Sequence, residues 1–114
     1  MLKHKIVLVP FPFDDLSTTK VRPAVCLTDP IGPHNHLILA FITSRVPDSP
    51  LDTDLVIDSA HADFDATGLR VSSTLQLHRL MTAMQTLLRR ELGVLSPTLQ
   101  AQVNDRLCKL FDFK

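Results

Sequence analysis

The sequence contains no tryptophan and no tyrosine, and phenylalanine occurs only six times. Proteins that bind single-stranded nucleic acid by stacking need aromatic faces for the bases, so this composition disfavours a stacking platform. An excess of either charge is also missing, because twelve Lys and Arg residues balance twelve Asp and Glu residues. A neutral chain has no overall field that attracts a polyanion. Any contact with nucleic acid must therefore come from a local basic patch or from a groove between two copies of the chain.

Cysteine is scarce, and the two residues present, Cys26 and Cys108, lie far apart in apolar surroundings. No disulfide scaffold and no C-x-x-C metal spacing can be built from them, so both are predicted to be buried free thiols.

The apolar run that follows Met1–Lys5 is short and is interrupted by Pro10 and Pro12. We therefore expect no signal peptide and no membrane span, and a cytoplasmic protein.

Metal-binding patterns are also sparse. His34 and His36 have an H-x-H spacing, but no third ligand is implied nearby, so they are interpreted as polar loop residues. His61 lies in a segment with several acidic residues, which are Asp58, Asp63 and Asp65. This segment is typical of a hydrated acidic loop, with binding of a hard cation as the weaker alternative. No metal and no other cofactor is expected.

The length of 114 residues predicts one domain that covers 1–114. The first two thirds contain β-rich runs without helical periodicity, at residues 6–9, 24–28, 36–43 and 54–57. Residues 59–70 have no clear period and predict a loop or one helical turn. Alternating apolar positions predict a half-buried strand over 71–77, which should bend and continue through 78–83.

The last part of the chain changes to helical signals. Residues 86–92 predict a short helix that Gly93 would cap. Ser96-Pro97 is typical of a helix start, with a capping hydroxyl followed by proline at the first helical position. Apolar residues then recur at three- and four-residue steps, at Leu99, Val103, Leu107 and Leu110. Short strands closed by one C-terminal helix predict a mainly β, compact barrel.

The segment Lys20–Leu27 places a cation and a proline directly before a β-forming run. Proline fixes its own φ and pushes the preceding residue out of the helical region, so Arg22 should be extended. We expect Arg22 at the mouth of a strand that begins near Ala24. A guanidinium held there can bind a phosphate with two parallel hydrogen bonds. The alternative is an ordinary surface arginine at a strand start.

The order of the segments resembles the MazF/PemK family of toxin endoribonucleases from type II toxin–antitoxin systems. Residues 6–13 run into a Pro-Phe-rich turn, the polar loop 14–20 precedes Arg22-Pro23, and a hydrophobic strand ends in Thr43-Ser44. The resemblance continues through 75–82 and the turn at 92–95. It implies an SH3-like small barrel of the MazF/PemK/CcdB type with a C-terminal helix. It also implies a homodimer that binds single-stranded RNA and a cognate antitoxin.

The resemblance also implies site residues. Metal-independent RNA cleavage needs a base for the 2′-hydroxyl, a cation for the phosphorane and a proton donor for the leaving oxygen. The arginine of the Arg-Pro pair is catalytic in the family, and Arg22 matches it. The Thr-Ser strand end contributes a hydroxyl, which Thr43 matches, with Ser44 as the weaker candidate. Lys20 is expected to contact backbone phosphate, and Asp14-Asp15 lies in a loop that borders the RNA groove in the family.

Some family members carry an Arg-x-Asp pattern, and here Gln76 and His78 occupy those positions. Glutamine cannot transfer a proton at neutral pH, although it can donate a hydrogen bond to RNA. Histidine can act as an acid or base near neutrality, so His78 is a catalytic candidate, with an ordinary surface histidine as the alternative. Arg79 can supply the missing cation, but strand alternation should place it on the opposite face from His78.

Three functions remain open from the sequence. The first is a sequence-selective, metal-independent endoribonuclease that acts on single-stranded RNA or mRNA. The second is a catalytically weak or inactive binding module, an antitoxin or co-repressor partner, which Gln76 and the zero net charge favour. The third is a toxin that poisons a protein target such as a topoisomerase. The chain is expected to dimerise, because a small barrel is unable to bury all of the apolar residues Leu80, Met81, Met84 and Leu87 by itself.

Overall fold

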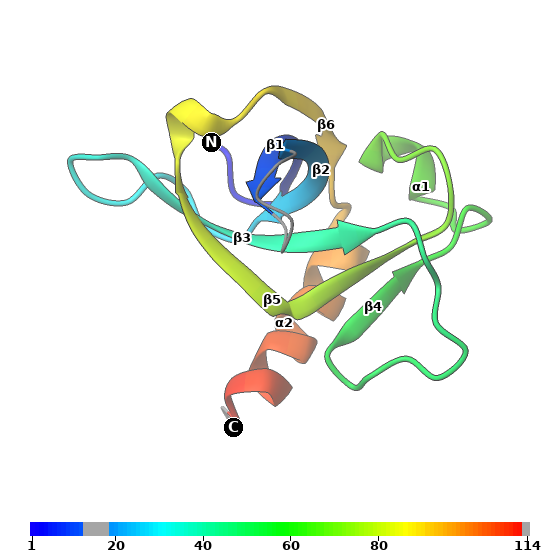
Figure 1. The fold of residues 1–114 in the computed structure, drawn as a ribbon. Helices are drawn as coiled ribbons and strands as arrows, with labels where there is room; N and C mark the ends of the chain where they lie inside the picture. Colours follow the sequence, from blue (N-terminus) through cyan, green and yellow to red (C-terminus); the bar gives the residue numbers. More distant parts are fainter. Residues whose placement is uncertain (13–18, 113–114) are drawn as a thin grey trace.

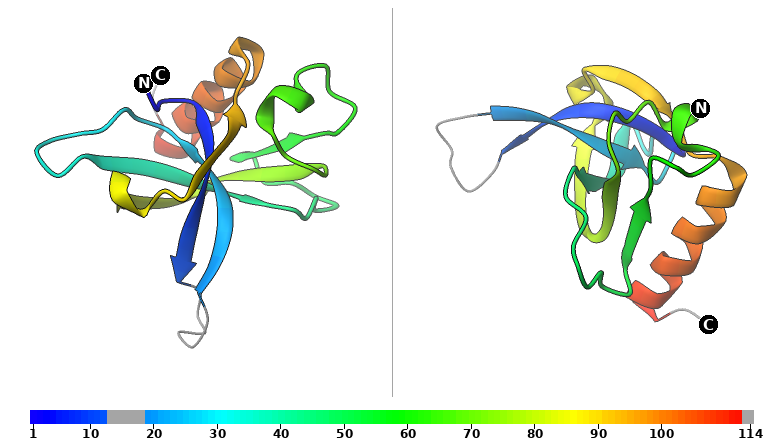
Figure 2. Two further views of the ribbon diagram at one scale, coloured as in Figure 1. Left: turned by 90° about the horizontal axis from the view of Figure 1, so that it is seen from above. Right: turned by 90° about the vertical axis from the view of Figure 1, so that its right-hand side faces the viewer.

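Strands β1 (Lys5–Pro12) and β2 (Thr19–Cys26) pair antiparallel and form an arm of the sheet. The computed structural model describes residues 1–12 and 19–112, and the side chains of residues 11, 12 and 19 are outside this description. Strand β2 pairs with β3 (His36–Thr43) only from Ala24 onward, so the outer half of the β1–β2 pair extends beyond the sheet (Figure 2). Pro23 has no amide hydrogen to donate, and it lies just before the paired stretch.

The sheet is curled and antiparallel, with the strand order β4-β5-β3-β2-β1-β6 (Figure 1). Strand β4 (Asp54–Ile57) lies at one edge and pairs with the long strand β5 (Ser73–Met84), while β6 (Arg90–Val94) lies at the other edge beside β1. The short helix α1 (Phe64–Thr67) contacts β6, and helix α2 (Pro97–Phe111) packs on β4 and β5. The expected mainly β, SH3-like small barrel with a C-terminal helix is confirmed.

Both faces of the curled sheet carry buried apolar side chains. One cluster lies between the sheet and α2 and includes Leu75, Leu99 and Val103, each at most 1% exposed. The other lies on the opposite face and includes Leu39 and Phe41 of β3. Burial on both faces explains why residues 36–43 form a nearly continuous apolar run rather than an alternating one.

Several sequence predictions agree with these bounds. The strands predicted at 36–43 and 54–57 are β3 and β4, and the helical turn predicted within 59–70 is α1. The predicted strand over 71–77 bends and continues through 78–83 as a single strand, β5. Helix α2 begins as its cap predicted, because Ser96 Oγ accepts a hydrogen bond from Leu99 N at 3.2 Å.

Three predictions about local structure were wrong. No helix spans 86–92; a 3₁₀ turn, η1 (Gln85–Leu87), is followed by strand β6, because pairing with β1 overrides the local helical signal. Strand β2 begins at Thr19 rather than near Ala24, so Arg22 lies within the strand. Cys26 is a buried free thiol as predicted, but Cys108 is exposed on α2.

The pairing of β3 with β5 contains a bulge that matters for the site. Ala40 pairs with Leu80, whereas the next residue, Phe41, pairs with Gln76. The segment 77–79 of β5 therefore has no partner on β3, and the strand bends there, as Figure 1 shows.

Among the described residues, no helix is long and apolar enough to cross a membrane.

Candidate functional site

A pocket of about 460 Å³ opens where β2, the end of β3 and the bend of β5 meet. It is lined by Arg22, Phe41, Ile42, Thr43, Ser44, Arg45, Gln76 and Arg79. The structure thus brings together residues from three separate stretches of the chain, including five of the seven sequence-predicted site residues. Among the residues that the structure describes, no carboxylate lines this pocket. The three arginines therefore concentrate positive charge at one point of a chain that is neutral overall.

Arg22 reaches the pocket from the part of β2 that pairs only with β1. It lies opposite Val9, two residues before Ala24, the first residue of β2 that pairs with β3. Its side chain is partly exposed, which leaves the guanidinium positioned by the strand and accessible from the pocket. A planar guanidinium in such a position can bind a phosphate through two N–H groups.

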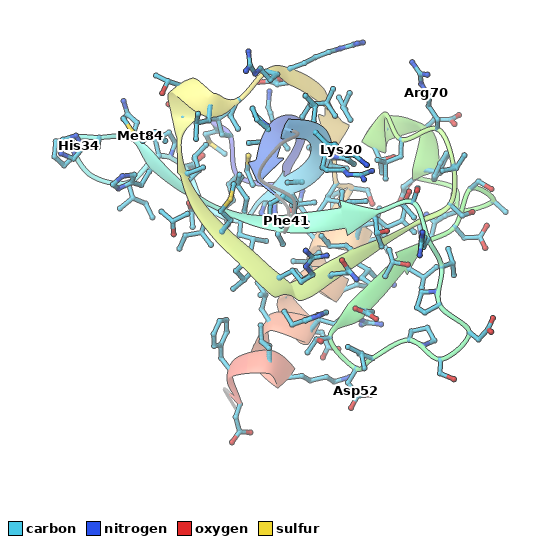
Figure 3. All side chains as sticks on the ribbon, viewed as in Figure 1. Lys20, His34, Phe41, Asp52, Arg70 and Met84 are labelled. Atoms are coloured by element: carbon cyan, nitrogen blue, oxygen red, sulfur yellow. The ribbon has the colours of Figure 1, made fainter. Side chains whose placement is uncertain are left out.

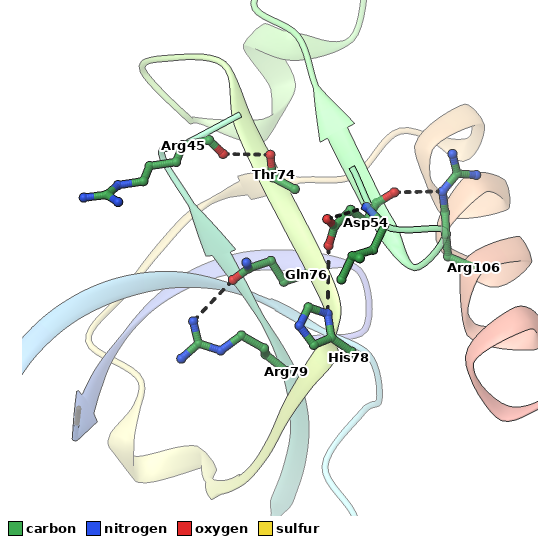
Figure 4. Close-up of polar contacts among 8 residues, drawn as sticks. Arg45, Asp54, Thr74, Gln76, His78, Arg79 and Arg106 are labelled. Atoms are coloured by element: carbon green, nitrogen blue, oxygen red, sulfur yellow. Dashed lines mark hydrogen bonds and ion pairs between the residues drawn. The ribbon is translucent and has the colours of Figure 1, made fainter. Parts of the chain in front are cut away.

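Thr43, the last residue of β3, contributes a hydroxyl at the same pocket. Its Oγ1 accepts a hydrogen bond from Arg45 N at 3.3 Å, so one lone pair and the hydroxyl hydrogen remain for a ligand. Arg45 O accepts a hydrogen bond of 2.8 Å from the buried hydroxyl of Thr74 on β5 (Figure 4). These two bonds fix the backbone that carries Thr43, Ser44 and Arg45 around the pocket.

Gln76 and Arg79 both line this pocket, although they are three residues apart on β5 and simple alternation would place them on opposite faces. Arg79 Nη1 donates a hydrogen bond of 3.4 Å to Gln76 Oε1 (Figure 4), and both side chains line the pocket. The bulge explains this difference, because the unpaired segment 77–79 breaks the two-residue period of the strand. His78 and Arg79 are both exposed.

His78 lines a second, adjoining pocket rather than the pocket around Arg22. This second pocket has a volume of about 510 Å³ and shares Thr43, Arg45 and Gln76 with the first. Here the Nδ1 atom of His78 lies 3.9 Å from Oδ1 of Asp54 at the start of β4 (Figure 4). Sequence reasoning missed Asp54, because only the pairing of β4 with β5 brings it beside His78.

A third pocket, of about 310 Å³, adjoins the first at Arg22. It shares Arg22, Ile42 and Ser44 with the first pocket, and Arg70 and Arg90 add positive charge to its lining. Sequence reasoning missed both of these arginines, since nothing local distinguishes them from other surface cations. Arg70 stands beside α1, as Figure 3 shows.

Lys20 is exposed on β2 and is not among the residues that line these pockets. It lies two residues before Arg22, so the two side chains leave the same face of the strand.

Asp14-Asp15 lies outside the described residues. Across residues 1–12 and 19–112, no group of three or more metal-ligating side chains is found. His34 and His36 lie close together with their ring centroids 5.8 Å apart.

Comparisons with known proteins agree with this architecture. The model of a family described as the PemK-like, MazF-like toxin of type II toxin–antitoxin systems matches residues 3–111. The solved structure of the Mycobacterium tuberculosis toxin MazF-mt6 superposes with a TM-score of 0.74 at 22% identity, over 96% of this chain and 98% of that one.

Two further solved structures from mycobacterial species share the fold. An endoribonuclease in complex with its cognate antitoxin has a TM-score of 0.72 at 11% identity, over 100% of this chain and 97% of that one. Another endoribonuclease has a TM-score of 0.65 at 10% identity, over 96% of this chain and 90% of that one. A search of curated protein sequences finds no significant match.

Proposed function

Because the chain belongs to the PemK-like, MazF-like toxin family of type II toxin–antitoxin systems, we propose that it is a metal-independent endoribonuclease that cleaves single-stranded RNA. The observation that carries the proposal is the pocket in which Arg22, Arg45 and Arg79 surround the hydroxyls of Thr43 and Ser44. A phosphodiester is an anion with oxygens that accept hydrogen bonds, and this set of donors and cations matches it.

The proposed reaction is an internal transfer at phosphorus. The 2′-oxygen of the RNA loses its proton to a base and bonds to the adjacent phosphorus, while the bond from phosphorus to the 5′-oxygen breaks. The departing oxygen takes up a proton, and the products carry a 2′,3′-cyclic phosphate and a 5′-hydroxyl. Arg22 stabilises the negative charge on the phosphorane, and the Thr43 hydroxyl donates to one of its oxygens. We assign His78 as the base.

Sequence selectivity is proposed to arise in the adjoining pocket. Its lining includes the apolar side chains of Val46, Pro47 and Leu51, which can contact the faces of a nucleobase next to the cleaved phosphate. Gln76 lies between the two pockets, where its amide can hydrogen-bond a base or a phosphate. Lys20 and Arg79 would contact backbone phosphates on either side of Arg22.

The proposed partners follow from the same family membership. The mycobacterial endoribonuclease that shares this fold was solved with its cognate antitoxin, and we propose an antitoxin partner for this chain. We further propose that residues 1–114 act as one toxin domain, as a homodimer in the cytoplasm. Leu80, Met84 and Leu87 are each more than a third exposed in the single chain and offer an apolar surface for such contacts.

Incubation of the purified protein with a mixed-sequence RNA in the presence of EDTA tests the proposal. We expect cleavage at defined sequences, with 2′,3′-cyclic phosphate ends. Arg22→Ala should lower the rate by about a hundredfold or more. Arg22→Lys should restore little of it, because an ammonium group cannot form the planar two-point contact. Arg89→Ala is the matched control, since Arg89 is an exposed arginine that lines none of the three pockets described above.

A binding module without catalysis is the second candidate. The observation that favours it concerns Gln76, which occupies the first position of the Arg-x-Asp pattern and transfers no proton. Its amide oxygen is engaged in a hydrogen bond from Arg79. In that case the wild type would bind RNA or antitoxin without cleaving RNA at any pH. A protein-poisoning toxin would instead arrest growth while neither binding nor cleaving RNA, and either result would overturn the endoribonuclease proposal.

A further inference from the structure

Asp54 has a buried carboxylate, and one of its two oxygens accepts no hydrogen bond from the residues that the structure describes. Its side chain is only 5% exposed. Oδ2 accepts a hydrogen bond from Leu51 N at 3.0 Å, but Oδ1 is buried and has no hydrogen-bond partner within the described part of the chain. A buried carboxylate oxygen without a donor is costly, so such an atom calls for a specific explanation.

The His78 ring lies beside this oxygen, with its Nδ1 atom 3.9 Å from Oδ1. Asp54 itself is held in place from two sides. Its amide and its carboxylate both bond to Leu51, and its main-chain oxygen accepts from Arg106 Nε of α2 at 3.2 Å. His78 is 38% exposed and lies on the bulged segment of β5, so its ring is the partner with freedom to move.

We propose that Asp54 is a positioning residue that accepts a hydrogen bond from Nδ1–H of His78 and thereby presents Nε2 of the ring to the RNA. The inference rests on the proposed function and assigns Asp54 a part in it. The proposal requires the ring to move until the separation of Nδ1 and Oδ1, now 3.9 Å, reaches hydrogen-bond distance, about 2.8 Å. The bond selects the tautomer in which Nε2 carries the lone pair, as a base requires.

The assignment gives the proton a defined route. Nε2 of His78 takes the proton of the 2′-hydroxyl as the 2′-oxygen attacks phosphorus, and the Asp54 carboxylate stabilises the imidazolium that results. The same ring then returns a proton to the leaving 5′-oxygen, so the enzyme ends in its starting state. The charged groups around the ring are Asp54 of β4, Arg45 and Asp48 of the segment after β3, and the neighbouring Arg79.

The variant Asp54→Asn tests the inference without disturbing the loop. The amide oxygen of asparagine can keep the hydrogen bond from Leu51 N, while its NH₂ group faces the histidine. An NH₂ group donates to Nδ1, so His78 should switch to the tautomer that carries hydrogen on Nε2. Two-bond ¹H–¹⁵N correlation spectra of the neutral rings report this tautomer directly, with His78→Ala used to assign the signals.

We expect an Nδ1–H ring for His78 in the wild type and an Nε2–H ring in Asp54→Asn, while the signals of His34 stay unchanged. RNA cleavage by the variant should lose about tenfold or more in kcat with little change in KM. A wild-type ring that already carries hydrogen on Nε2 overturns the inference, and so does a variant ring that does not switch. If the variant fails to fold, the wild-type spectrum alone still decides.

The failure of this inference can be told apart from the failure of the proposed function. If Arg22→Ala abolishes cleavage but the His78 tautomer does not respond to Asp54, the endoribonuclease proposal stands and the positioning role fails. If the tautomer switches but the wild type cleaves no RNA, the Asp54–His78 contact exists and the proposed function fails.

Discussion

Thr74 donates its hydroxyl hydrogen to the main-chain oxygen of Arg45 across 2.8 Å, and this bond joins the start of β5 to the segment after β3. Thr74 has no exposed surface, although it carries a hydroxyl. Because Arg45 N also donates to Thr43 Oγ1, both polar groups of the Arg45 backbone are engaged. The wall of the pocket around Arg22 is thus held by two hydrogen bonds rather than by a free loop.

Replacing Thr74 by valine tests this relationship. Thr74→Val keeps the shape of the side chain but removes the hydrogen-bond donor. We expect the free energy of unfolding to fall by about 1 kcal/mol, as for loss of one hydrogen bond. RNA cleavage should fall further than stability alone explains, because Thr43 loses its fixed position. Urea denaturation and cleavage rates at saturating RNA measure the two effects.

The control for this change is Thr82→Val on the same strand. Thr82 is exposed, so its replacement should leave both stability and cleavage close to the wild-type values. Equal effects of the two variants would show that the Thr74 hydroxyl has no special part in holding the pocket.

The sequence predicted those parts of the fold that local signals determine. The strand over residues 36–43 was predicted correctly because β-forming residues run through it without a break, and α2 because Ser96 and Pro97 mark its first turn. Strand β6 was missed because it exists only through pairing with β1, from which it is distant in sequence. The meeting of Gln76 and Arg79 in one pocket was missed because a bulge in β5 cannot be read from alternation.

The same distinction holds for the candidate site. Arg22, Thr43, Ser44 and Gln76 were identified from motif positions and Arg79 from its place next to His78, and the fold gathers these five residues in one pocket. Asp54 and Arg90 carry no local signal, since a single aspartate at a strand start and a single arginine on an edge strand are ordinary surface choices. Their places become evident only when β4 pairs with β5 and β6 pairs with β1.

Arg70 and Arg90 are expected to extend the path of the RNA beyond Arg22. Each lines the third pocket, which continues from the pocket around Arg22. Replacement of either by alanine should weaken RNA binding and reduce the slope of log affinity against log salt by about 0.7, as for one lost phosphate contact with a single strand. Fluorescence anisotropy with a labelled oligonucleotide, measured over a salt series, gives this slope.

Arg89→Ala provides the comparison for charge alone. It removes one exposed arginine from the same short segment without changing either pocket lining. A slope for Arg89→Ala equal to that for Arg90→Ala would mean that the third pocket does not bind phosphate and that only net charge matters.

The two thiols should differ sharply in reactivity. Burial, with Glu91 adding to it, raises the pKa of the Cys26 thiol to about 11, and Cys26 has no exposed surface. Since the thiolate is the reactive form and forms only as pH approaches the pKa, Cys26 should stay unreactive at pH 8. Exposed Cys108 should react with Ellman's reagent, which gives one thiol per native chain and two after denaturation. The native Cys108→Ser variant should give none, and a rapid reaction there would show that β2 opens.

Gly93 is expected to be required for the contact between β6 and α1. A Cβ atom at Gly93 would lie 2.2 Å from Ala66 O and 2.4 Å from Thr67 C, which are backbone atoms that cannot rotate away. Gly93→Ala should therefore lower the free energy of unfolding by roughly 2 to 3 kcal/mol, as overpacking does. Gly32→Ala serves as the comparison, because Gly32 has a φ of +73° but nothing within 4 Å of its Cβ position. Its cost should be about 1 to 2 kcal/mol from backbone strain alone.

The two glycine variants should also differ in RNA binding. Strand β6, which contacts α1 at Gly93, contains Arg90 and Leu92, and both residues line the third pocket. Displacement of β6 by Gly93→Ala should weaken RNA binding even at temperatures where the variant is fully folded. Gly32 lies in the turn before β3, outside the lining of all three pockets, so Gly32→Ala should bind RNA as the wild type does. Urea denaturation at a constant m-value, followed by anisotropy on the folded variants, separates the two effects. Equal stabilities for the two variants would mean that α1 moves freely away from β6 and that the contact at Gly93 is not rigid.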